Sequence, residues 1–271
     1  MALTTYDQII ANQQYPITFT KLFSGTLTAS RPYSTWGLAG TGGTGTFDTT
    51  LNGVVVSGDS TGRLPFPDPP AGNTCYLSSI EVNAPASGIL TLCDRLWHNG
   101  GITATITTAQ SITSPTWPTR DNNASSNGDG VYIGLEVSAA TGAGTPVISV
   151  EYTNSADASG KSGNNIFATP ASAAARSFFP IELVSGDKGV RSVQSITLSA
   201  TWTSGTINLV AYRPIFSMSI EQGWTQITTD PISGGVPQLQ SNSAPFFLFL
   251  PGSAGTISGG ALTGRMIWSV G

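Results

Sequence analysis

The segment Val190–Tyr212 reads VRSVQSITLSATWTSGTINLVAY and decides the fold class. From Ile196 to Trp202, apolar residues alternate with residues that carry hydroxyl groups, which gives a strand one apolar face. Ser204-Gly205 is a turn signal, because glycine tolerates the positive φ of a tight hairpin, and the alternation resumes at Ile207. The segment therefore predicts an antiparallel hairpin with its apolar residues on one face.

A fainter copy of this pattern lies about a hundred residues earlier, where residues 77–84 lead through Ser87-Gly88 into residues 89–92. Each copy follows a Phe-Pro step, Phe66-Pro67 in one case and Phe179-Pro180 in the other. A third hairpin is predicted from residues 131–137 and 147–152. The two similar hairpins fit either an internal duplication or two segments that obey the same rules. All three indicate an all-β protein with antiparallel sheets.

The composition narrows the possible functions. Charged residues make up 10% of the 271 residues, against about 25% in an ordinary domain. Such a low content of charged residues is typical of proteins whose surface is partly covered by other subunits, or of a plain β-sandwich with Ser and Thr on its outer face. The net charge is −4 and the 11 basic residues are scattered, so we expect no nucleic-acid partner. No apolar run approaches the ~20 residues of a membrane helix, and no signal peptide is evident, so we expect no membrane partner and assembly in the cytoplasm.

The N-terminus predicts the only helix, over Thr4–Gln14, with a threonine cap and an apolar stripe of Tyr6, Ile9 and Ile10. A helix this short is marginal alone, so the stripe is expected to dock on the chain's own body or on a partner. Residues 17–45 read as an extended arm. We therefore divide the chain into a helix and arm (1–50), a sandwich core (51–214) and a C-terminal extension (215–271).

The most apolar run is Phe246-Phe247-Leu248-Phe249-Leu250. Consecutive large apolar residues cannot alternate in and out of a half-exposed sheet, so both faces of a strand here must be covered. The run is predicted to pack at a subunit interface around a trimer axis. The alternative is a central strand of the chain's own core.

Catalytic candidates are few. Gly58-Asp59-Ser60-Thr61-Gly62 fits the pattern of a hydrolase nucleophile elbow, but prolines follow it where the elbow requires a helix. The base of a serine triad would have to be His98, the only histidine, with Asp94 nearby in sequence. Cys75 and Cys93 are predicted to fall out of register and to be free thiols. No enzyme activity is expected, and a serine hydrolase at Ser60 remains a remote alternative.

Ligand candidates are also weak. Asp121, Asn123 and Asp129 could offer oxygens to calcium, but a solvated loop is the simpler interpretation. One histidine and two mispaired cysteines do not make a zinc site, and the Gly-rich run 40–45 has no lysine and no following helix, so we expect no cofactor and no metal. The tryptophans expected near strand ends or loops could form a glycan platform or belong to the core or a subunit contact: Trp97, Trp117 and Trp224.

Four segments resemble a family of tailed-bacteriophage virion proteins associated with the head: MALTTYDQII (1–10), DRLW (94–97), YTNSADASGK (152–161) and GDKGVRSV (186–193). The resemblance implies a capsid decoration (cement) protein on the outer surface of the virion. Such proteins often form trimers at local three-fold positions, so the implied partners are the major capsid protein and further copies of the chain.

The sequence as a whole predicts an all-β antiparallel β-sandwich, jelly-roll-like, with a short N-terminal helix and an extended arm. The leading function is a phage head decoration protein that bridges capsomers. The alternative is a tail or fibre component that binds a host glycan through aromatic side chains of its loops.

Overall fold

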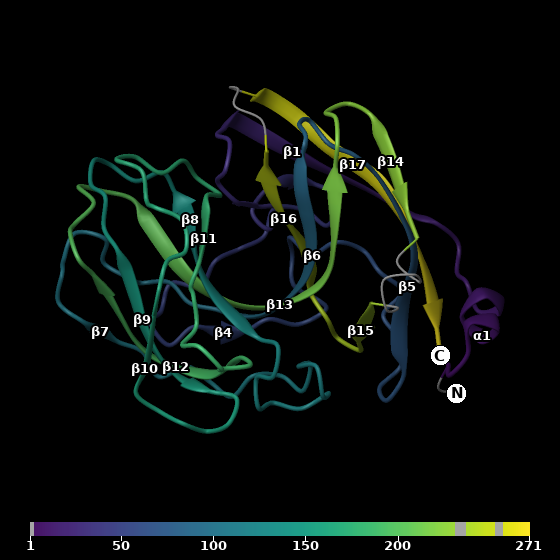
Figure 1. Ribbon diagram of the computed structural model, residues 1–271, viewed down its shortest axis with the longest axis horizontal. Helices are drawn as coiled ribbons and strands as arrows, with labels where there is room; N and C mark the ends of the chain where they lie inside the picture. Colours follow the sequence, from purple (N-terminus) through teal and green to yellow (C-terminus); the bar gives the residue numbers. More distant parts are fainter. Residues whose placement is uncertain (1–2, 231–236, 253–256) are drawn as a thin grey trace. The chain divides into compact units, whose positions relative to one another are not determined.

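The computed structural model describes residues 3–230, 237–252 and 257–271, and it is built from strands and one short helix (Figure 1). The strand pairings of these residues are antiparallel, which confirms the predicted all-β class. The chain forms two compact units. Unit 1 comprises Met1–Thr46, Ser57–Asp94 and Pro214–Gly271, and unit 2 comprises Phe47–Val56 and Arg95–Arg213.

Unit 1 has two sheet layers. The first follows the order β14-β5-β17-β1-β3, with β15 also paired to β5. Its strands are β14 (Gln226–Thr229), β5 (Thr74–Asn83), β17 (Ile257–Val270), β1 (Ile17–Leu27), β3 (Ala39–Gly40) and β15 (Gln238–Gln240). The second layer contains β16 (Pro245–Pro251), which pairs with β2 (Tyr33–Ser34) on one side and with residues 88–94 of β6 (Gly88–His98) on the other.

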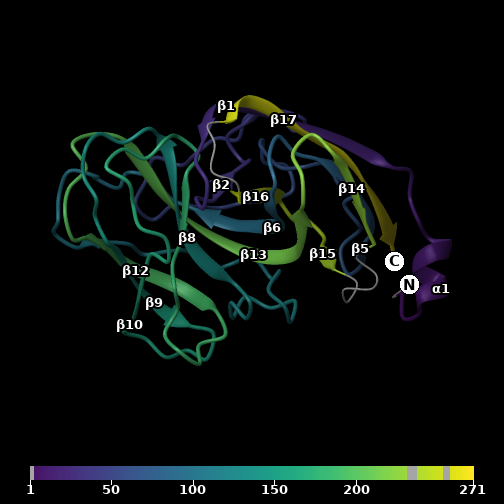
Figure 2. The same cartoon turned by 45° about the horizontal axis from the view of Figure 1, so that its top comes forward.

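The two layers of unit 1 enclose one hydrophobic core. Phe19 of β1 faces Phe247 of β16 with ring centroids 5.2 Å apart, and Phe23 faces Phe249 at 5.9 Å. Figure 2 shows β1 and β17 side by side. In this pair Ile17 lies opposite Met266. Unit 1 is therefore a β-sandwich by itself.

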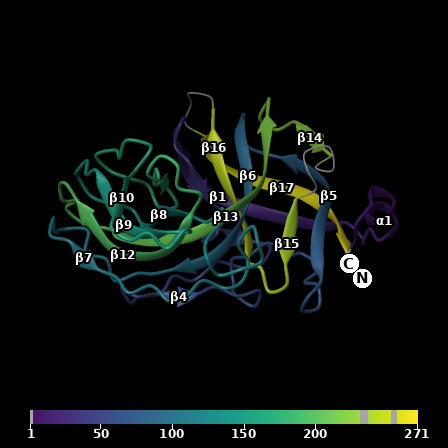
Figure 3. The same ribbon diagram turned by 60° about the horizontal axis from the view of Figure 1, so that its bottom comes forward.

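Unit 2 is a second sandwich with its own core. One layer has the order β10-β9-β12-β7, and Figure 3 shows its first three strands side by side. These strands are β10 (Lys161–Asn164), β9 (Ile148–Asn154), β12 (Val190–Leu198) and β7 (Gln110–Ser111). The facing strands are β11 (Phe178–Pro180), β8 (Tyr132–Ala139), the first half of β13 (Thr206–Ile220), and β4 (Val54–Val55) on the end of β6.

The three predicted hairpins are wrong in their pairing. β12 and β13 lie in different sheets, as do β5 and β6, and β8 and β9. Each turn connects one layer of a sandwich to the other. Alternation places apolar residues on one face of both strands, and that face can be buried equally well across the core as beside a neighbouring strand. Leu198 and Leu209 are accordingly both in the core of unit 2.

The helix α1 spans Tyr6–Ala11, shorter than the predicted range. The segment interpreted as an arm is extended, but β1 pairs with β17 along its whole length and contributes to the core of unit 1. The chain passes between the two units after Thr46 and after Arg213, close to the predicted boundaries at residues 50 and 214, and also after Val56 and Asp94. Residues 57–94 belong with both termini, because β5 and β1 flank the same C-terminal strand, β17.

Candidate functional site

The N-terminal helix presents apolar side chains outward. Ile9 is buried at 5% exposure on the side of α1 that lies against β17 and β5. Tyr6 and Ile10 are 58% and 57% exposed. They are four residues apart and therefore neighbours on the helix surface. We call Tyr6 and Ile10 the α1 surface.

The α1 surface is held in a fixed place on unit 1. Thr5 caps the helix in a capping box, in which its hydroxyl accepts the N–H of Gln8 and the Gln8 side chain accepts the N–H of Thr5. The hydroxyl of Ser269 on β17 donates to the carbonyl of Ile9, and the N–H of Gln14 donates to Trp268 at 2.7 Å. The helix is therefore capped at its start and tied to β17 in its C-terminal half before any partner arrives.

The apolar run 246–250 lies in β16, a central strand. Phe246, Phe247 and Phe249 are fully buried and Leu248 is 8% exposed, all within a single chain. Phe247 belongs to the core of unit 1, while Phe246 meets the edge of Trp36 at 6.3 Å on the other face. The interface expectation for these residues is thus wrong, and the core-strand alternative holds. Both faces are indeed covered, but by the chain itself.

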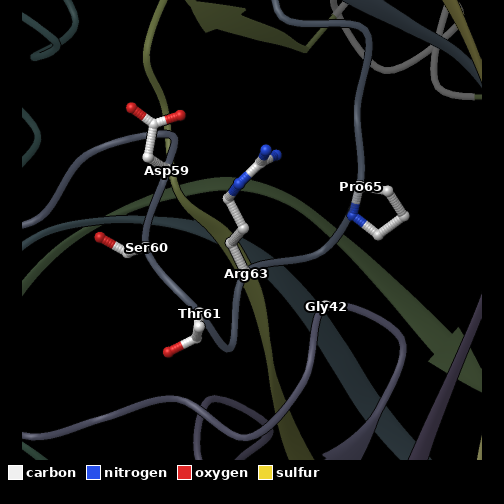
Figure 4. Close-up of a pocket in the computed structure, with 6 residues that line it drawn as sticks. All are labelled: Gly42, Asp59, Ser60, Thr61, Arg63 and Pro65. Carbon is white, nitrogen blue, oxygen red and sulfur yellow. The ribbon is translucent and has the colours of Figure 1, made fainter.

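Ser60 lines a pocket of about 250 Å³ in unit 1, together with Gly42, Asp59, Thr61, Arg63 and Pro65 (Figure 4). The side chains of Asp59 and Arg63 extend from the same loop (Figure 4). The Ser60 hydroxyl accepts the N–H of Ser57 at 3.2 Å, as expected for a turn residue. Ser60 is therefore part of the loop's own hydrogen bonding.

His98 and Asp94, the two residues considered as triad partners of Ser60, form hydrogen bonds with other residues. His98 is buried in unit 2, and its Nδ1 accepts the Nε–H of Arg95 at 3.0 Å. Burial, and secondarily the charge of Arg95, lower the pKa of His98 to about 2, so it cannot serve as a base. The carboxylate of Asp94, in unit 1, accepts the Ser243 hydroxyl at 3.0 Å and the Ala244 N–H at 2.7 Å. These contacts give a serine hydrolase at Ser60 no support.

A buried ionic cluster surrounds His98 in unit 2 and was not anticipated. Arg95 Nη1 lies 2.6 Å from Glu136 Oε2, with both side chains fully buried. The guanidinium groups of Arg95 and Arg176 lie 5.6 and 5.3 Å from the ring centroid of Phe47. Burial lowers the pKa of Arg95, whereas the Glu136 charge raises it. The cluster fastens the Phe47 segment to unit 2.

The suspected calcium ligands organise their own loop. Asp121 accepts N–H groups from Asn123, Ser125, Gly128 and Asp129, and the Ser125 hydroxyl. Burial raises the pKa of Asp121, but the bonds from Ser125, Asn123 and Asp129 outweigh it and lower the pKa overall. Within the part of the chain that the structure describes, no three His, Cys, Asp or Glu side chains gather as a metal site.

The three tryptophans considered for a glycan platform do not form one surface, because two of them are buried. Trp97 and Trp117 are buried in the core of unit 2 with their ring centroids 5.3 Å apart, while Trp224 is 60% exposed in unit 1.

Cys75 and Cys93 are buried free thiols, as predicted. Over the described residues, the search for a helix long and apolar enough to cross a bilayer finds none.

No family model matches the chain, and no curated protein matches it. The comparison with solved structures returns capsid proteins of infectious bursal disease virus. The VP2 subviral particle is 8% identical, covers 99% of this chain and 83% of that one, and has a TM-score of 0.18. The T=1 particle is 9% identical, with coverage of 96% and 78% and a TM-score of 0.16. TM-scores this low do not establish a common fold.

Proposed function

We propose that the chain is a structural virion protein, a decoration protein that binds the outer surface of a tailed-phage head and bridges capsomers. The α1 surface is the observation that carries this proposal. Its partners are the major capsid protein and further copies of the chain, in a trimer at a local three-fold position. The chain is assembled in the host cytoplasm and acts without a cofactor and without catalysis.

The α1 surface suits a permanent contact because its geometry is already fixed. Burying a large apolar side chain contributes about 1.5–3 kcal/mol, and somewhat more than half of Tyr6 and of Ile10 is still exposed. Covering the remainder of both contributes roughly 2 kcal/mol, or about 30-fold in affinity. The capping box and the contacts with β17 lower the entropy lost on binding, since the helix is ordered beforehand.

The rest of the chain supports a passive role. Charged residues are only 10% of the sequence, so a large contact desolvates few ionised groups. The ion pair of Arg95 with Glu136 is fully buried inside unit 2, so its charges are not presented to a partner. The sequence resemblance to head-associated virion proteins gives the same assignment.

A binding experiment tests the proposal. Heads assembled from the major capsid protein alone are incubated with purified chain and sedimented. Replacing Tyr6 and Ile10 together with serine is expected to weaken binding about 30-fold, because roughly 2 kcal/mol of apolar burial is lost. Ile166→Ser is the matched control, because Ile166 in unit 2 is 56% exposed, like Ile10 at 57%.

Equal binding of the double variant and the parent would contradict the role of the α1 surface. Failure of the parent chain to bind heads at all would contradict the decoration assignment. A copy number of a few per virion, in place of hundreds, would favour the tail or fibre alternative.

A further inference from the structure

Trp224 combines exposure with an unfavourable backbone. Its side chain is 60% exposed, whereas the other five tryptophans of the chain are at most 2% exposed. Its φ is +62°, in the left-handed region that bulky residues rarely adopt. Such strain persists only where the surroundings enforce it, and it concentrates at functional sites.

The connection that carries Trp224 is seated on a second turn of unit 1. Residues 221–225 join β13 to β14, and the N–H of Trp224 donates to the carbonyl of Ala84 at 2.8 Å. A Cβ on Gly223 would lie 2.9 Å from the backbone of Ala86, so glycine permits this close approach. The indole edge reaches over Gly260, where an added Cβ would come within 3.1 Å of Cη2. The ring is therefore held from one side and open on the other.

The side chains beside the indole in the sequence are polar. Glu221, Gln222, Thr225 and Gln226 are exposed, and the residues of the facing turn, Pro85 and Ala86, are buried. A protein interface ordinarily needs a larger apolar surround and about 800 Å² from each partner. One pyranose ring requires only an aromatic face for its C–H groups and a few amides or carboxylates for its hydroxyls.

We propose that Trp224 is the stacking platform of a carbohydrate-binding site, with Glu221, Gln222 and Gln226 as candidate hydrogen-bonding partners for the sugar hydroxyls. The ligand class is a terminal or internal pyranose of a surface glycan. A single sugar on an open platform is expected to bind with a dissociation constant on the order of 1 mM, and several copies on one particle would raise the avidity. This site is separate from the α1 surface, so it gives the protein a second binding activity.

The test begins with the purified full chain on a printed array of bacterial and animal oligosaccharides. The methyl glycoside of the best-bound terminal sugar is then titrated by saturation-transfer NMR. The same sugar should protect the parent chain from iodide quenching, because Trp224 is the exposed indole. Trp224→Asn is the key variant, since asparagine tolerates a positive φ and the turn should remain folded. It is expected to bind the sugar at least about tenfold more weakly.

Two controls complete the design. Trp224→Phe retains an aromatic face and should bind with intermediate affinity, while Tyr15→Ala removes another exposed aromatic, at 92% exposure, and should leave binding unchanged. Absence of saccharide binding by the parent chain would overturn the proposal, as would equal binding by a folded Trp224→Asn variant. If that variant instead lost head binding, Trp224 would be a protein contact. The double variant in which Tyr6 and Ile10 are replaced with serine should still bind the sugar, which separates the carbohydrate site from the α1 surface.

Discussion

The buried histidine of unit 2 predicts a specific acid sensitivity. The pKa of His98 is lowered from 6.5 to about 2 in the folded chain, first by burial and then by the charge of Arg95. At a pH between these two pKa values, the histidine is protonated in the unfolded chain but neutral in the folded chain, so the free energy of unfolding falls as the pH falls below about 6.5. At pH 4.5, two units below the unfolded value, the loss is about 2.7 kcal/mol at 1.36 kcal/mol per unit.

His98→Asn isolates this contribution. The asparagine oxygen occupies nearly the place of Nδ1 and can still accept the Nε–H of Arg95, but it does not titrate. Urea unfolding is measured for both proteins at pH 7.0, 5.5 and 4.5. Carboxylates affect both proteins equally, so the difference between the two curves reports the histidine. Between pH 7.0 and 4.5, the free energy of unfolding of the variant should rise by about 2.5 kcal/mol relative to that of the parent protein. Parallel curves would refute the reasoning and imply that His98 is protonated in the folded state or accessible to water.

Four further perturbations follow from the packing. Trp202→Ala should lose about 3–5 kcal/mol of unfolding free energy, because the side chain is fully buried, whereas the exposed neighbour Thr201→Ala should change it by less than about 0.5 kcal/mol; urea unfolding measures both. Phe247→Asp should unfold unit 1, and a folded but dissociated protein by light scattering would restore the interface interpretation. Glu136→Gln should cost about 3–5 kcal/mol by leaving Arg95 without its counter-charge, measured by the same unfolding assay. Asp121→Ala should lower the melting temperature, while calcium or a chelator should leave that of the parent unchanged; a calcium-dependent shift would contradict the loop assignment.

Local patterns anticipated the local structure well. Alternation placed Leu198 and Leu209 on buried faces, and the threonine with the apolar stripe marked a capped helix. The helix ends at Ala11, short of the predicted Gln14, and Gln13 already forms an antiparallel bridge with Ser269. The two free thiols also followed from the sequence.

Long-range pairing could not be inferred in the same way. The alternation around Ser204-Gly205 is the same whether the strands pair within one sheet or face each other across a core, so the connections between layers were interpreted as hairpins. Nothing local signals that β1 pairs with β17 over two hundred residues away. Burial of the run at Phe247 was predicted, but whether the chain or a partner supplies the cover depends on that same topology.

Of the candidate site residues, sequence patterns identified Tyr6 and Ile10 but could not tell which side of the helix faces outward. The positive φ of Trp224 is a backbone property of the connection between β13 and β14, and the Arg95–Glu136 pair joins distant strands. Neither has a signature in the neighbouring sequence.

One measurement tests the proposed decoration role directly: a cryo-EM map, at side-chain resolution, of virions of the phage that we propose encodes this chain. We expect density for the chain repeated over the outer face of the head, with Tyr6 and Ile10 of α1 buried against the major capsid protein or a neighbouring copy. Density confined to the tail, or a head-bound chain whose α1 surface points into solvent, would contradict it.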